Sequence, residues 1–226
     1  NMGKITDFSI HDVYDADGQL KGHVEPPFAI RRYLPSVNWY LRDSNFNTDF
    51  SKGAIASAIF LNTEMQQGVD GVVGVDLSFV KNLLGTIGPV NVADYSQNVT
   101  AENFYQITQG YTENNFFPGS TQKKDFLRSL FNSIKLKLSN EKNISYFNIL
   151  DTLIKSLEEK HIVFAFNSTD LQSVFSVNGW GSTLFDEREP GDRVINDFVG
   201  INEANLGANK VNYFITRSVS QKITLE

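Results

Sequence analysis

The most constraining feature of this chain is a strand–helix–strand pattern with sharp boundaries in its first half. Residues 71–75 form a short apolar run that is typical of a buried strand. Asp76 is suited to cap a following helix, in which apolar residues recur at helical spacing. Gly88 and Pro89 then end that helix, and residues 90–92 are predicted to form a second strand. This order of elements favours an α/β fold.

Similar patterns continue along the rest of the chain. Apolar residues three or four positions apart predict helices over about residues 50–67, 121–138 and 146–160, and shorter helices that begin near Thr100 and Ser168. Apolar runs predict further strands over residues 161–166 and 211–225. We therefore expect an α/β fold with a mixed central sheet and helices on both of its faces. The strands expected to share this sheet are residues 71–75, 90–92, 162–166 and 211–225.

Composition limits the number of domains and the classes of function. The 226 residues can bury a large core, and we expect residues 1–226 to form a single α/β domain. The formal net charge is −6 and the basic residues are scattered, which argues against a nucleic-acid partner. The chain has no cysteine, so disulfides, thiolate metal sites and cysteine nucleophiles are excluded. No apolar run is long enough to span a membrane.

Three charged residues precede the first long predicted helix and form the main candidate site. Arg42, Asp43 and Asp49 lie where the N-terminus of that helix would offer free N–H groups and partial positive charge. Arg42 would neutralise phosphate oxygens, and Asp43 and Asp49 would hold a Mg²⁺ ion through carboxylate oxygens. The alternative is an ion pair between Arg42 and Asp43, with Asp49 as a helix cap.

Other polar residues are secondary candidates for ligand binding. Lys123, Lys124 and Arg128 would contact an anion, and the alternative is an exposed basic face of the helix predicted near residues 121–138. Asn209 and Lys210 lie in a turn that also contains glycine, so they belong either to a structural turn or to a saccharide-binding loop.

Asp76 and His161 are two further candidate site residues. Asp76 would reach the same edge of the sheet, although capping a helix is a sufficient role for it. His161 has no metal-ligand spacing to another histidine and is predicted to be a satisfied core or edge residue. The sequence contains no nucleophile elbow, phosphate-binding loop or dinucleotide fingerprint.

Several motifs, taken in order, resemble one bacterial family. They are Leu41-Arg42-Asp43-Ser44-Asn45-Phe46 with Asp49-Phe50, Asp70-Gly71-Val72-Val73, Gly88-Pro89-Val90, His161-Ile162, Asp170-Leu171-Gln172, Gly179-Trp180 and residues 202–210. Over nearly the whole chain they resemble the domain of unknown function DUF4012, which has no established activity. Members of that family carry an upstream glycine-rich strand motif and an N-terminal membrane anchor. The resemblance therefore implies a truncated extracytoplasmic piece of a membrane-anchored protein of the cell surface.

More distantly, the strand order resembles the LytR-CpsA-Psr domain, which implies a three-layer α/β architecture. Those proteins transfer glycopolymers from polyprenyl-pyrophosphate lipids to peptidoglycan. Arg42-Asp43 is similar to the Arg-Asp pair that holds pyrophosphate with a divalent metal in that family, which implies a catalytic role for both residues. Lys123 or Lys124 stands where that family has an arginine on a later helix. This is a departure, because lysine does not grip phosphate with two parallel hydrogen bonds.

Two functional hypotheses follow, and the sequence leaves open whether the chain is an enzyme. The first is a cell-envelope glycopolymer phosphotransferase that acts on polyprenyl-pyrophosphate-linked substrates. The second is a non-catalytic cell-surface scaffold or ligand-binding module. The expected partners are a polyprenyl-pyrophosphate glycolipid or a cell-wall polymer, with membrane contact only through an anchor outside this chain. A long hydrophobic tunnel beside Arg42 would favour the first hypothesis, and a filled interior the second.

Overall fold

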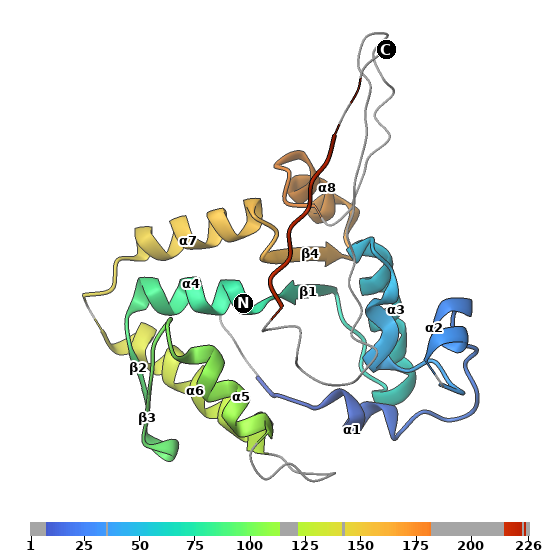
Figure 1. Ribbon diagram of the computed structural model, residues 1–226, viewed down its shortest axis with the longest axis horizontal. Helices are drawn as coiled ribbons and strands as arrows, with labels where there is room; N and C mark the ends of the chain where they lie inside the picture. Colours follow the sequence, from blue (N-terminus) through green and yellow to red (C-terminus); the bar gives the residue numbers. More distant parts are fainter. Residues whose placement is uncertain are drawn as a thin grey trace. The chain divides into compact units, whose positions relative to one another are not determined.

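The computed structural model describes residues 8–34, 36–113, 122–141, 143–181, 215–222 and 224 (Figure 1). The chain comprises two compact units, one from residues 1–25 and 38–186 and the other from residues 26–37 and 187–226. In the second unit the structure describes the helix α2 (Phe28–Tyr33). All other elements named below belong to the first unit. The expectation of a single domain over residues 1–226 stays a prediction.

The structure confirms the α/β class but divides the expected sheet. Strand β1 (Gly71–Val75) pairs antiparallel with β4 (Ile162–Phe166). Strand β2 (Val90–Val92) pairs instead with β3 (Gln97–Val99) in a separate two-stranded sheet. The prediction that residues 90–92 join the sheet of residues 71–75 is therefore wrong. A hairpin closed by a short connection loses less loop entropy than a long-range pairing, which explains the local choice of β2.

The predicted last strand is only partly covered by the described residues. Residues 211–214, 223 and 225 lie outside them. Residues 215–222 are described and carry no regular secondary structure, so the strand prediction is wrong for that part. The side chains of residues 215–222 are exposed.

Helix boundaries follow the capping signals in the sequence. Asp49 Oδ1 accepts a hydrogen bond from the Ser51 N–H at 2.9 Å and begins α3 (Phe50–Met65). Asp76 begins α4 (Leu77–Ile87), which ends at Gly88, a residue with a φ of 76°. Ser145 and Ser168 begin α7 (Tyr146–Glu158) and α8 (Thr169–Val177) in the same way. The remaining elements are α1 (Val13–Asp17), the 3₁₀ helices η1 (Leu41–Phe46) and η2 (Ala93–Tyr95), α5 (Phe104–Glu113) and α6 (Gln122–Asn140).

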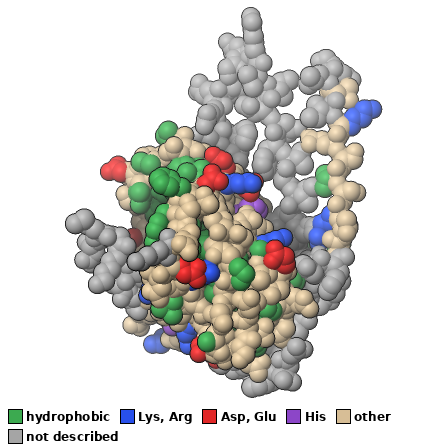
Figure 2. All heavy atoms as spheres, turned by 90° about the vertical axis from the view of Figure 1, so that its left-hand side faces the viewer, with side chains coloured by type: hydrophobic (Ala, Val, Ile, Leu, Met, Phe, Trp, Pro, Cys, Tyr) green, Lys and Arg blue, Asp and Glu red, His purple; other side chains and the backbone are tan. Residues whose placement is uncertain are grey.

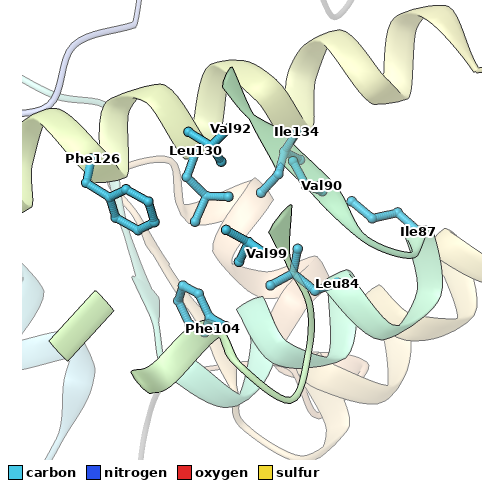
Figure 3. Packing of buried hydrophobic residues seen from close by; sticks show 9 residues of the cluster. All are labelled: Leu84, Ile87, Val90, Val92, Val99, Phe104, Phe126, Leu130 and Ile134. Atoms are coloured by element: carbon cyan, nitrogen blue, oxygen red, sulfur yellow. The ribbon is translucent and has the colours of Figure 1, made fainter. Parts of the chain in front are cut away.

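The main hydrophobic core lies between α4, α5, α6 and the β2–β3 hairpin. Nine buried side chains from these elements point toward one another in Figure 3: Leu84, Ile87, Val90, Val92, Val99, Phe104, Phe126, Leu130 and Ile134. Alternation along β2 places Val90 and Val92 in this core, whereas Asn91 is exposed. Helix α7 joins through its packing on α4, where the hydroxyls of Thr86 and Thr152 lie 2.6 Å apart.

The surface of the first unit mixes apolar and charged groups. Figure 2 shows a face on which hydrophobic side chains gather in the upper part, while acidic and basic side chains are interspersed over it. The N-terminal part of α7 is notably apolar on its outer side, where Tyr146, Phe147 and Leu150 are exposed. Helix α7 therefore carries apolar surface outside the core as well as within it.

Burial along α6 indicates which of its phenylalanines matters most for stability. Phe126 has 0% of its surface exposed, whereas Phe131 is half-buried and stacks on Phe8 with ring centroids 3.8 Å apart. We expect Phe126→Ala to lower the free energy of unfolding by about 3–5 kcal/mol, because it leaves a cavity in the core. We expect Phe131→Ala to cost about 1–2 kcal/mol, because less apolar surface is removed from burial. Urea denaturation of both variants checks this order, and a larger loss for Phe131→Ala would contradict it.

Candidate functional site

Arg42 lies in η1 and is held by two carboxylates. Its Nη1 donates a hydrogen bond to Asp17 Oδ2 at 2.7 Å, and its backbone N–H donates to Asp17 Oδ1 at 3.3 Å. Asp17 is the last residue of α1, and its side chain is only 5% exposed. On the other side, Arg42 Nε lies 3.4 Å from Asp43 Oδ2. The structure therefore brings Arg42 and Asp43 together, as predicted, and adds a buried partner that the sequence analysis missed.

The faces of the Arg42 guanidinium are also in contact with protein. Its central carbon lies 4.3 Å from the ring centroid of Tyr40 and 5.6 Å from that of Tyr14. A guanidinium stacked on aromatic rings gains cation–π attraction while its edges donate hydrogen bonds. Arg42 thus connects η1 to α1 in two ways: the edge of its guanidinium binds Asp17, and the face of its guanidinium lies near Tyr14.

Asp49, in contrast, has a separate structural role. Its carboxylate caps the N–H of Ser51, and its own N–H donates a hydrogen bond to Asn47 Oδ1 at 2.9 Å. Among the residues that the structure describes, no group of three or more histidine, aspartate or glutamate side chains is placed to hold a metal ion. A Mg²⁺ site formed by Asp43 and Asp49 stays a prediction.

A third carboxylate, that of Glu64 near the end of α3, belongs to the same charged cluster. Glu64 is 4% exposed, and its Oε1 accepts a hydrogen bond from the Leu41 N–H at 3.2 Å. Its Oε2 has no hydrogen-bond partner in the described part of the chain. Burial raises the pKa of Glu64, the Leu41 hydrogen bond opposes this, and Asp17 adds to the rise. Three carboxylates therefore share the positive charge of one arginine.

Asp43 responds to the same surroundings. Burial raises the pKa of Asp43 most, the Arg42 charge lowers it, and the Asp17 charge raises it. The net direction of the Asp43 pKa is upward although an arginine is adjacent, because burial outweighs the attraction of the Arg42 charge. Burial therefore affects the pKa of Asp43 more than either neighbouring charge does.

The basic candidates on α6 are paired with protein groups too. Lys124 Nζ donates to Asp15 Oδ2 at 2.9 Å, and this hydrogen bond lowers the pKa of Asp15. Arg128 donates to the Ile10 carbonyl at 3.2 Å and lies 3.5 Å from the Asp125 carboxylate. Lys124 and Arg42 thus bind two acids of the same short helix, α1. The Lys123 side chain, Asn209 and Lys210 lie outside the described residues.

His161 forms a small polar cluster at the start of β4. Its Nδ1 lies 2.7 Å from Asp76 Oδ2, and its Nε2 lies 3.5 Å from Glu159 Oε2. Asp76 Oδ1 also accepts a hydrogen bond from the Phe79 N–H at 3.0 Å. This confirms His161 as a satisfied edge histidine and Asp76 as a helix cap.

Sequence reasoning missed a large cavity on another side of the first unit. Its volume is about 790 Å³. It is lined by residues of η2, β3, α5 and α6 and the short connection between β3 and α5: Tyr95, Gln97, Asn103, Gln106, Ile107, Gly110, Tyr111, Gln122 and Asp125. A smaller apolar groove of about 260 Å³ runs along α3, where Trp39, Ile55 and Phe60 contribute to its lining. Arg42 lines neither cavity.

Comparison with known proteins supports part of the sequence-based resemblance. Residues 2–111 match the family described as Protein of unknown function (DUF4012). The match covers α1, η1 and the Arg42 cluster, so this part of the chain is similar to that family. The resemblance to the LytR-CpsA-Psr domain is not shown. No curated protein and no solved structure matches the chain significantly.

Within the described residues, none of the helices combines the length and the apolar character needed to cross a bilayer.

The burial of Glu64 predicts a pH-dependent stability change. A carboxylate whose pKa is raised on folding stabilises the fold at acidic pH and does so less as the pH rises through its folded pKa. Glu64→Gln keeps an oxygen to accept the Leu41 hydrogen bond but removes the charge. We therefore expect the variant to gain stability relative to wild type at pH 8, with the difference shrinking toward pH 4.

Urea denaturation at pH 4, 6 and 8 measures this difference. Glu158→Gln, at an exposed position on α7, is the matched control and should show little change at any pH. If the Glu64→Gln variant lost stability equally at all three pH values, Glu64 would not be a buried carboxylate whose charge destabilises the fold.

Proposed function

We propose that this chain is a non-catalytic ligand-binding module of the bacterial cell surface. The observation that carries this proposal is the neutralisation of Arg42 by the buried Asp17. A phosphotransferase needs its guanidinium aimed at phosphate oxygens, where charge develops during the reaction. Here Asp17 and Asp43 bind the edges of the guanidinium, and Tyr40 lies close to its face.

A comparison of free energies favours a structural role for Arg42 over anion binding. Turning the guanidinium toward a phosphate would leave the buried Asp17 carboxylate without its ion-pair partner, and losing one partner of a buried ion pair costs about 3–5 kcal/mol. A new hydrogen bond to a charged group returns about 1.5–3 kcal/mol. The nearby carboxylates of Asp43 and Glu64 would add repulsion. The balance therefore disfavours an anion at this position.

The extracytoplasmic location is part of the proposal. It is supported by the cysteine-free composition and by the sequence motifs that resemble DUF4012, a family that the resemblance associates with a membrane anchor. On this basis the ligand is expected among cell-wall polymers or related envelope glycans. The 790 Å³ cavity supports a binding role, because it offers space that the charged cluster does not.

A glycopolymer phosphotransferase acting on polyprenyl-pyrophosphate glycolipids is the second candidate. One observation favours it: Arg42 and Asp43 lie side by side, and their side chains are 31% and 24% exposed. A ligand could therefore approach this pair from solvent. Mg²⁺ would be needed to offset the repulsion between Asp43 and a pyrophosphate.

Calorimetric titration with pyrophosphate separates the two candidates. We expect no Mg²⁺-dependent binding to wild type, because Asp17 already binds Arg42. We also expect Arg42→Ala to lower the free energy of unfolding by about 3–5 kcal/mol, measured by urea denaturation, since it leaves Asp17 buried and unpaired. Lys135→Ala, which removes an exposed cation from α6, is the matched control and should change neither property.

The double variant Asp17→Ala with Arg42→Ala completes a thermodynamic cycle. We expect the double variant to be less destabilised than the sum of the two single variants, because the unpaired charge is then absent. Tight Mg²⁺-dependent pyrophosphate binding by wild type, lost in a folded Arg42→Ala or Arg42→Lys variant, would instead establish the phosphotransferase site.

A further inference from the structure

We propose that the cavity between η2, β3, α5 and α6 binds a neutral saccharide. This inference rests on the proposed ligand-binding function and names the chemical class of the ligand. It is carried by three properties of the described cavity lining: a rigid aromatic wall, several polar side chains without protein partners within the described part of the chain, and the lack of a basic residue among the described lining residues.

The aromatic wall is formed by Tyr95 and Tyr111 and is supported from behind by Phe126. The two tyrosine rings meet edge to face with centroids 5.1 Å apart. Tyr111 stacks on Phe126 at 4.5 Å, and Tyr95 meets the same ring edge to face at 5.2 Å. Because Phe126 is fully buried in the core, this wall is pre-organised before a ligand arrives.

The polar side chains of the cavity are available to a ligand. Gln97 of β3, Gln106 of α5 and Gln122 of α6 line the cavity, and none of the three amides hydrogen-bonds to protein within the described residues. Each amide offers two donors and an acceptor. The hydroxyls of Tyr95 and Tyr111 are likewise without protein hydrogen bonds in the described part of the chain. Hydroxyl groups of a sugar match this mixture of donors and acceptors.

Asn103 shows the contrast between a structural and an available amide. Its Oδ1 accepts a hydrogen bond from the Thr100 N–H at 2.7 Å, and its Nδ2 donates to the Asn98 carbonyl at 2.9 Å. Asn103 therefore holds the start of α5 in place, whereas the three glutamines around the cavity face ligand or solvent.

Charge at the cavity disfavours an anionic ligand. Among the described residues that line the cavity, Asp125 is the single charged one. Burial raises the pKa of Tyr95, and the Asp125 charge adds to the rise, so the Tyr95 hydroxyl stays protonated as a donor at neutral pH. A phosphate in the cavity would be repelled by the Asp125 carboxylate, which Arg128 partly neutralises at 3.5 Å, whereas the hydroxyls of a neutral sugar carry no charge to be repelled.

An apolar ligand fits less well than a saccharide. It would cover the unpaired amides and hydroxyls without offering them hydrogen bonds, which costs free energy for each group. A sugar ring instead places its C–H face on an aromatic ring and its hydroxyls on the amides. The volume of about 790 Å³ lies within the usual range of ligand cavities, roughly 300–1,000 Å³.

Titration of the full chain with maltotriose, cellotriose and triacetylchitotriose tests this inference. Backbone amide NMR locates the binding, and calorimetry measures its affinity. We expect at least one trisaccharide to shift signals of β3, α5 and α6. Gln106→Ala should weaken that binding about 5- to 30-fold through loss of hydrogen bonds, and Tyr111→Phe should weaken it while leaving the aromatic wall in place. Gln67→Ala and Tyr146→Phe, at exposed positions away from the cavity, are the matched controls and should bind as wild type does.

The outcomes separate this inference from the proposed function. Saccharide-induced shifts confined to other elements would overturn the cavity as the site but leave a ligand-binding module standing. No shift with any of the three trisaccharides would overturn the inference. Mg²⁺-dependent pyrophosphate binding at Arg42 would overturn the proposed non-catalytic function, whatever the saccharide titrations give.

Discussion

The ion pair between Arg42 and Asp17 is the interaction on which the arrangement of the N-terminal elements depends. Helix α1 has five residues and η1 has six, and helices of that length are not stable by themselves in water. The pair holds the end of α1 on η1, while Lys124 binds Asp15 and joins α6 to the same helix. Three elements far apart in sequence are thereby fixed through the acids of one short segment.

This arrangement places two demands on a single arginine. Arg42 must offset the charge of Asp17, and it must also moderate Asp43 and Glu64, whose pKa values are raised by burial. Supplying the same guanidinium to a substrate anion would remove that compensation from all three carboxylates. A structural role and an anion-binding role therefore compete at Arg42. The buried and closely paired Asp17 favours the structural one.

Local features of the fold were predictable from sequence, and long-range pairings were not. The side chains of Asp49, Asp76 and Ser168 each accept a hydrogen bond from a backbone N–H two or three residues later. The starts of these helices could therefore be predicted correctly from the local sequence. Strand β3 reads Gln97-Asn98-Val99 and lacks an apolar run, so the hairpin partner of β2 left no periodic signal. The Arg42–Asp17 pair spans 25 residues, and no spacing rule connects such positions.

The two candidate sites likewise differ in how far the sequence could reveal them. Arg42 and Asp43 could be predicted as a candidate site because they are adjacent and precede a helix. In the structure, however, Arg42 forms ion pairs with Asp17 and Asp43. The saccharide cavity carries no motif, because Gln97, Gln106 and Gln122 come from three separate elements and each alone is an ordinary surface residue. In a folded chain, polar groups that already hydrogen-bond to protein serve the fold, as at Asn103. Polar groups that stay unpaired beside a rigid aromatic wall are the ones left to recognise a ligand, since a bound sugar supplies the hydrogen bonds that the protein does not.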